Sequence, residues 1–117
     1  MANNLASLDS AFHALADPTR RAVISRLIAG PASVSELAQP FAIGLPSFMK
    51  HLKVLEDSGL IGSGKTGRVR VCHLQPARLA AAESWIAEQR AIWEGRADRL
   101  AAYVENHIHG SQDDAQS

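Results

Sequence analysis

The sequence predicts a mainly α-helical fold that carries one small β-hairpin. Apolar residues recur at steps of three and four along most of the chain, which is the pattern of helices with one buried face. Residues 60–74 break this rhythm, because glycines there separate two short runs that are typical of strands. Aromatic residues make up only 5% of the chain while alanine is abundant, and this balance favours helices packed closely through small side chains.

An apolar stripe and a capping signal predict the first two helices. The stripe of the first helix consists of Leu5, Leu8, Phe12 and Leu15. This helix should end near Ala16, because Asp17 can cap a second helix whose first turn accommodates Pro18. The second helix should stop at Gly30. Its inward side chains are expected to be Val23, Ile24, Leu27 and Ile28.

The third and fourth helices also carry start and stop signals. Ser33 and Glu36 have the spacing of a capping box, which predicts a short third helix that ends around Pro40. A fourth helix should start around Pro46 and run until Gly59 supplies a left-handed stop. The buried seam of this helix is expected to consist of Leu45, Phe48, Leu52 and Leu55.

Two short strands are expected after the fourth helix, at residues 60–61 and 68–74, with a glycine-rich tip at residues 62–67. Valines alternate with arginines in the second strand, which predicts one dry face and one cationic face. These alternating residues are Arg68, Val69, Arg70 and Val71.

A long helix should start at Pro76 and continue to about Asn106. No internal repeat or long linker interrupts the chain, and its 117 residues suit one domain. We therefore expect a single domain over residues 1–109 and a disordered polar tail over residues 110–117.

The composition narrows the class of protein. Cys72 is the single cysteine, so neither an internal disulfide nor a zinc site built from several thiolates is expected. No run approaches 18 apolar residues, and the first ten residues lack the pattern of a signal peptide. A cytoplasmic protein without a membrane partner is the simplest interpretation.

Charge is unevenly distributed along the chain. The 12 basic and 12 acidic residues give a formal net charge of zero. Residues 45–70 nevertheless hold five basic and two acidic side chains, whereas residues 71–117 hold four basic and seven acidic ones. A basic segment of this kind attracts the phosphate backbone of nucleic acids.

The fourth helix and the hairpin together predict a DNA-binding surface. Two short helices joined by a tight turn, the second of which presents donors, are typical of a helix-turn-helix that enters a major groove. With the apolar seam inward, the outward side chains are expected to be Pro46, Ser47, Lys50, Lys53 and Val54, flanked by Met49 and His51. The hairpin adds Lys65, Arg68 and Arg70.

Three stretches resemble the ArsR/SmtB-type winged-helix repressors: LADPTRR at residues 15–21, LPSFMKHLKVLEDSGLI at 45–61 and GKTGRVR at 64–70. The resemblance covers nearly the whole chain, and this order of motifs is specific. It implies a homodimeric winged helix-turn-helix repressor that binds a palindromic operator in double-stranded DNA, uses no cofactor and is released by an unknown signal.

The resemblance assigns base contacts to the fourth helix, at Ser47, Lys50, His51 and Lys53, and assigns the wing to Lys65, Arg68 and Arg70. The full set of candidate DNA-binding residues is Ser33, Ser35, Pro46, Ser47, Met49, Lys50, His51, Lys53, Lys65, Arg68 and Arg70. Many relatives carry serine where this chain has Met49, so a contact is lost there or an apolar contact with a thymine methyl is gained.

The long helix also predicts a dimer. A helix of about 30 residues is roughly 45 Å long, which exceeds the body of a small domain. Part of its apolar seam, together with the first helix, should therefore pack against a second copy across a two-fold axis. The expected interface residues are Leu5, Leu8, Phe12, Leu79, Ala82, Ile86, Trp93 and Leu100.

Other functions stay open at this stage. A metal-responsive repressor would bind zinc or nickel through His107, His109 and the partner's His13, although the third helix lacks the cysteine cluster of metal sensors. A protein-interaction dimer that has lost DNA binding is a second alternative. Cys72 as a redox sensor is less favoured than Cys72 as a core residue.

Trp85 and Trp93 could line a ligand pocket for a small-molecule effector, although large interface residues are the more common use of such side chains. An enzyme is not expected. The run SGKT at residues 63–66 lacks the upstream spacing of a phosphate loop, and no catalytic triad or carboxylate pair can be placed.

Overall fold

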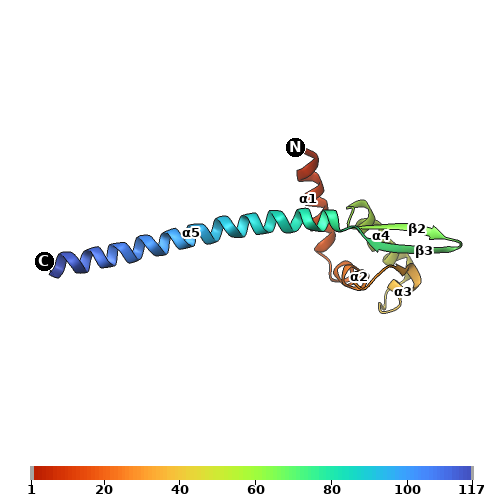
Figure 1. Ribbon diagram of the computed structural model, residues 1–117. Helices are drawn as coiled ribbons and strands as arrows, with labels where there is room; N and C mark the ends of the chain where they lie inside the picture. The colour runs from red at the N-terminus through yellow and green to blue at the C-terminus, as the bar shows by residue number, and fades with distance from the viewer. Residues whose placement is uncertain (1, 117) are drawn as a thin grey trace. The chain divides into compact units, whose positions relative to one another are not determined.

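The computed structural model describes the backbone of residues 2–116 and the side chains of residues 7–108. Its elements are, in chain order, α1 (Ala2–Leu15), α2 (Pro18–Ile28), β1 (Ala32–Ser33), α3 (Val34–Ala38), α4 (Leu45–Asp57), β2 (Ile61–Thr66), β3 (Val69–Leu74) and α5 (Pro76–Gln116) (Figure 1). The chain divides into two compact units, one up to Ala82 and the other from Glu83 onward. The predicted class, mainly helical with a small hairpin, is confirmed.

Side-chain caps start α2 and α3 as the sequence predicts. The Asp17 carboxylate accepts a hydrogen bond from the backbone N–H of Arg20 at 3.0 Å, and Pro18 occupies the first turn of α2. The Ser33 hydroxyl accepts from the Glu36 N–H at 3.1 Å and donates to the Glu36 carboxylate at 3.0 Å. The capping box is therefore complete.

Gly59 ends α4 in the manner that the sequence predicts. Its φ is +78°, a left-handed conformation that glycine adopts without a steric penalty. The Gly59 N–H donates to the Glu56 carbonyl at 3.0 Å, and the Leu60 N–H donates to the Leu55 carbonyl at 3.1 Å. These two bonds form a Schellman motif, which satisfies carbonyls at the end of the helix.

The sheet has three antiparallel strands in the order β1-β3-β2. Thr66 pairs with Val69, so the hairpin turn consists of Gly67 and Arg68, with Gly67 at a φ of +66°. The glycine-rich stretch expected as the tip belongs instead to β2, because glycine is permitted in an extended edge strand. Strand β1 was not predicted, since two residues carry no periodic pattern.

The core of the first unit joins all four N-terminal helices to the sheet. Its largest fully buried side chains are Phe48, Leu37, Leu55, Leu60, Ile61, Val23 and Cys72. Ala11 and Ala14 bring α1 into the same cluster. Small side chains on α1 therefore allow the close helix packing that the composition predicts.

Several predictions of burial are wrong. Ile28, Leu45 and Val69 were expected to point inward, but they are 72%, 57% and 50% exposed. Each lies at or next to the end of its element, and a periodic stripe gives a direction without showing where along the element the core stops. Val54, which was expected to point outward, packs against the core instead.

Helix α5 continues to Gln116, past the predicted end near Asn106, so residues 110–116 are helical where a disordered tail was expected. Gly110 is the one strong helix breaker in this stretch, and a single glycine weakens a helix without ending it. At the start of α5, Leu79 packs against the core of the first unit and Ala82 is buried.

Candidate nucleic-acid interface

Helix α4 presents a polar and basic face to solvent. Its opposite face is anchored by Phe48, Leu52 and Leu55, which are buried. The ring of Phe48 also stacks on Phe41, with 5.5 Å between the centroids, and this contact fixes the connection that leads into α4. The exposed side chains of α4 include Pro46, Ser47, Met49, Lys50 and Lys53, as the sequence predicts.

A groove lies between α4 and the β2–β3 hairpin. It is lined by Pro46, Met49, Lys50, Leu52, Lys53, Glu56 and Arg70. Three cations thus meet one carboxylate at this groove, and a phosphate group would complement that charge. Of the predicted site residues, the groove brings Arg70 of the hairpin together with four residues of α4, which are Pro46, Met49, Lys50 and Lys53.

A chain of hydrogen bonds ties the hairpin to α4. The Arg70 Nε donates to the Ser63 hydroxyl at 3.1 Å, and this hydroxyl donates to the Glu56 carboxylate at 2.6 Å. Arg70 takes part in this chain through its Nε, and its side chain is exposed. The sequence analysis missed both Ser63 and Glu56.

Cations continue toward the tip of the hairpin. Lys65 lies directly opposite Arg70 in the β2–β3 ladder, and both side chains are exposed. Like charges at directly opposite positions destabilise a hairpin, and a bound phosphate would relieve that cost. Arg68 is exposed within the two-residue turn itself. The hairpin therefore has the form and charge of a wing that tracks a DNA backbone.

The two serines at the start of α3 differ in availability. The hydroxyl of Ser33 is engaged twice by Glu36, and Arg26 lies 3.6 Å from the second oxygen of the Glu36 carboxylate. Ser35 is exposed. Of this predicted pair, Ser35 is the residue whose hydroxyl is not used by the cap.

His51 points toward α2 more than into the groove. Its Nδ1 lies 3.1 Å from Nη1 of Arg20 and 3.7 Å from the Asp17 carboxylate, and its ring is largely buried, with 24% of the side chain exposed. A guanidinium can only donate, so Nδ1 is the acceptor of the shorter contact, and the longer one exceeds hydrogen-bond range. The position assigned to base reading is thus engaged within the protein.

The pKa of the Asp17 carboxyl lies below its ordinary value. The backbone hydrogen bond from Arg20 is the main cause, and it outweighs the opposing effect of partial burial. His51 and the Arg20 charge lower this pKa further. The cap of α2 is therefore ionised at neutral pH.

Cys72 is a core residue. It is fully buried in β3, and burial is the main cause that raises the pKa of its thiol. Glu56 raises this pKa as well, against an opposing effect of Arg70. The thiol is therefore protonated at neutral pH, which disfavours a redox sensor.

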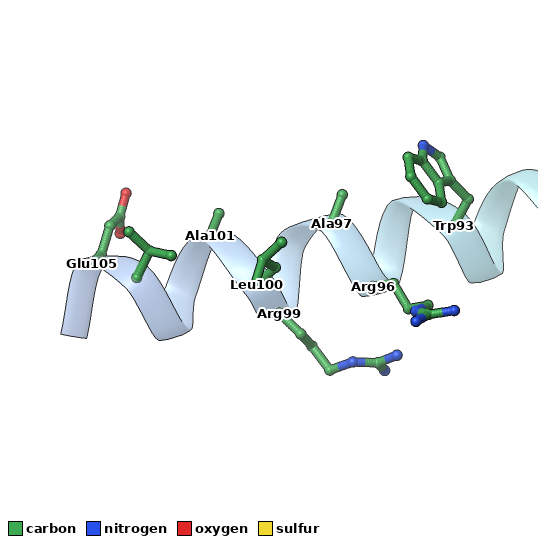
Figure 2. Close-up of a pocket in the computed structure, with 8 residues that line it drawn as sticks. Trp93, Arg96, Ala97, Arg99, Leu100, Ala101 and Glu105 are labelled. Atoms are coloured by element: carbon green, nitrogen blue, oxygen red, sulfur yellow. The ribbon is translucent and has the colours of Figure 1, made fainter. Parts of the chain in front are cut away.

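The second unit carries an apolar strip along α5. Trp93, Ala97 and Ala101 follow one side of the helix, with Arg96 and Arg99 along another (Figure 2). Leu100, Val104 and Glu105 complete the lining of this strip. Trp93 is 68% exposed and Leu100 is 64% exposed.

The other predicted interface residues fall into three groups. Ile86 is exposed, as a contact with a second chain requires. Leu8 and Phe12 are half-buried on α1, whereas Leu79 and Ala82 are used within the first unit. Leu5 lies outside the residues whose side chains are described.

The residues of the metal hypothesis are only partly described. The ring of His107 lies 4.0 Å from that of Tyr103, and the side chain of His109 is outside the described range. Among the described residues, no three histidine, cysteine or acidic side chains come together as metal ligands would.

In the same part of the chain, no helix is long and apolar enough to cross a bilayer.

Taken together, a helix with an exposed basic face, the short helix before it and a basic hairpin beside it define a winged helix-turn-helix protein. Residues 15–62 match a family described as a helix-turn-helix domain.

Comparison with known proteins agrees with this class. The chain is 45% identical over 75 residues to the HTH-type transcriptional regulator Rv2034 of Mycobacterium tuberculosis, covering 64% of this chain and 70% of that protein. It is 28% identical over 79 residues to the transcriptional repressor SdpR of Bacillus subtilis, covering 68% of this chain and 88% of that one.

Among solved structures, an ArsR family transcriptional regulator matches with a TM-score of 0.72 and 58% identity, over 75% of this chain and 97% of its own. This chain therefore belongs to the ArsR family of helix-turn-helix transcriptional regulators, a class of DNA-binding proteins and not of enzymes. The resemblance noted in the sequence is confirmed.

Proposed function

We propose that this chain acts in the cytoplasm as a homodimeric repressor that binds a palindromic operator and is released by an effector. The observation that carries the proposal is the groove between α4 and the hairpin, where Lys50, Lys53 and Arg70 meet. The Bacillus subtilis relative SdpR is a transcriptional repressor, which supports repression over activation.

The proposed contacts follow from which side chains are exposed. Pro46, Ser47, Met49, Lys50 and Lys53 enter the major groove, while Lys65, Arg68 and Arg70 approach phosphates or the minor groove and Ser35 adds a phosphate contact. Ser33 and His51 are removed from the set, because the Ser33 hydroxyl and Nδ1 of His51 already serve the protein.

The homodimer is proposed from the strip on α5. Trp93 and Leu100 expose most of their surface, and contiguous apolar patches of this kind mark interaction sites. A second copy offers the same strip, so one apolar face can cover the other across a two-fold axis.

Charge selects an antiparallel arrangement of the two α5 helices. Arg96 and Arg99 lie in the first half of the strip and Glu105 in the second half. Antiparallel helices bring the arginines toward the partner's Glu105, whereas parallel helices would place like charges side by side. A two-fold symmetric dimer would offer two copies of α4 to a palindrome whose half-sites lie about one DNA turn apart.

Binding to the DNA upstream of the protein's own gene, measured by fluorescence anisotropy and footprinting, tests this function. We expect symmetric protection of two half-sites. Lys50→Ala should weaken binding by about 1–3 kcal/mol if Lys50 contacts a base, and Arg68→Ala should flatten the salt dependence by about one phosphate contact. Arg90→Ala, which removes an exposed cation of α5 from outside the strip, is the control.

The outcome also separates the alternatives. A dimer with no affinity for any DNA fragment would indicate a protein-interaction module and contradict the proposal. DNA binding that changes tenfold or more with added zinc would identify a metal-responsive regulator. Unchanged affinity in both Lys50→Ala and Arg68→Ala would show that α4 and the hairpin are not the DNA site.

A further inference from the structure

The side chain of Arg20, a residue of α2, links α1 to α4. Its Nε donates to the Ala14 carbonyl at 2.7 Å, and its Nη2 donates to the His13 carbonyl at 3.0 Å. Its Nη1 donates to the His51 ring at 3.1 Å. One guanidinium therefore holds the last carbonyls of α1 and a side chain of α4 together.

The backbone of Arg20 is itself held in position. Arg20 lies in the first turn of α2, where its backbone N–H is bonded to the capping carboxylate of Asp17. This bond fixes the backbone position from which the Arg20 side chain extends. A planar fork with fixed donor directions suits such a junction better than a flexible ammonium.

His51 belongs to α4, the helix that carries the proposed DNA contacts, so its bond to Arg20 anchors that helix. It lies one position after Lys50 and two before Lys53, the exposed cations of the groove. Because Nδ1 accepts from Arg20, the proton of a neutral ring is on Nε2. The bond between Arg20 and His51 therefore restrains the orientation of α4, and with it the face that carries the proposed DNA contacts.

We infer that Arg20 and His51 are positioning residues for DNA recognition, joining the end of α1 to the recognition helix. The inference rests on the proposed function, since it concerns how α4 meets DNA. Helix α1 also carries Leu8 and Phe12, residues of the predicted dimer surface. The Arg20 contact therefore joins α4 to the helix that carries these two residues.

Two substitutions at residue 51 distinguish positioning from base reading. Asparagine places an oxygen acceptor near the position of Nδ1, whereas glutamine places its polar end near the position of Nε2. We expect His51→Asn to bind DNA within about threefold of the wild type, and His51→Gln to lose about tenfold, the range of one charge-assisted hydrogen bond. The reverse order would show that Nε2 reads DNA and would overturn the inference.

Arg20→Ala and Arg21→Ala form a matched pair at the same helix end. The described hydrogen bond of Arg21 goes to the Leu15 carbonyl of α1 at 2.8 Å and does not reach α4. We expect Arg20→Ala to weaken DNA binding about tenfold and Arg21→Ala about threefold at most. In an Arg20→Ala background, His51→Gln should have no further effect, and full additivity of the two losses would contradict the inference.

Nitrogen NMR of the His51 ring provides a readout that does not need DNA. The wild type should show an Nε2–H tautomer with Nδ1 unprotonated, and Arg20→Ala should shift it toward tautomer exchange. If the wild-type protein binds no DNA, the proposed function fails, while these shifts still report the contact. If DNA binds and neither the shifts nor the affinity respond to Arg20→Ala, the positioning role is wrong.

Discussion

The two units of the chain use apolar side chains in opposite ways. Up to Ala82, Phe48, Leu55 and their neighbours are buried within the same chain. From Glu83 onward, Trp93 and Leu100 lie largely exposed on one helix. The first unit is therefore stabilised by its own core, whereas the second has apolar surface that a second chain can cover.

The largest effect should come from breaking the core of the first unit. Phe48→Ala removes a fully buried ring and its stack on Phe41, and we expect it to lower the free energy of unfolding by about 3–5 kcal/mol. Chemical denaturation followed by circular dichroism measures this loss. A cost below about 1 kcal/mol would contradict a core that is complete within one chain.

The strip of the second unit should respond to charge without unfolding the first. Ala101 lines the strip and Ala102 does not, although both are exposed alanines of α5. We expect Ala101→Lys to raise the dimer dissociation constant about tenfold or more, because it would bury an ammonium in an apolar contact.

Sedimentation velocity over a range of concentrations measures that constant. Ala102→Lys, with the same side chain one position away, should leave it nearly unchanged. Equal effects of the two substitutions would show that the strip is not the dimer surface.

A smaller effect is expected where the first unit depends on backbone conformation. Gly59 has a positive φ, and a Cβ there would lie 3.1 Å from the side chain of Arg78. Gly59→Ala should lower the free energy of unfolding by about 1–2 kcal/mol, the cost of a left-handed alanine. Gly64→Ala, where no neighbouring atom lies within 4 Å of the added Cβ and φ is not positive, is the control for thermal denaturation.

The smallest effect should be the pH dependence of the α2 cap. The folded pKa of Asp17 lies below the ordinary value of 3.8, so the ionised cap stabilises the fold above that pH. This stability is lost as the pH falls through the lower folded pKa. Asp17→Asn keeps a capping side chain but cannot titrate.

The denaturation midpoint of each protein is measured at neutral pH and at pH 3. The change of the midpoint with pH should therefore differ between the wild type and Asp17→Asn. The wild type should lose more stability on acidification than the variant. Parallel curves would show that the carboxylate is not what sets the cap.

Local signals predicted most of the first unit. The helix ends are set by bonds between residues a few positions apart, so sequence spacing is sufficient to place them. These signals are Asp17 with Pro18, Ser33 with Glu36, and Gly59. The exposed face of α4 followed in the same way from its buried seam. Strand β1 and the true turn at Gly67 and Arg68 did not, because pairing partners distant in sequence decide register.

In the candidate site, too, the sequence predicted the features set by nearby residues but not those set by contacts between distant ones. The sequence predicted the exposed cations Lys50, Lys53 and Arg68 from periodicity and composition. It could not show that Ser63 lies between Arg70 and Glu56, since this contact depends on the hairpin register and on how the hairpin meets α4. Nor could it separate Ser35 from Ser33, whose hydroxyl is used by the cap.

By itself, the sequence determined the helical periodicity, the caps, the basic segment and the family, because these depend on neighbours along the chain. Tertiary structure decided where the core ends, and this left Ile28 and Leu45 exposed. It also decided which polar atoms are already hydrogen-bonded within the protein. It also turned His51 toward Arg20, a residue 31 positions away. The reason is physical: hydrogen bonds and burial depend on distance in space, which spacing in the sequence reports only within a few residues.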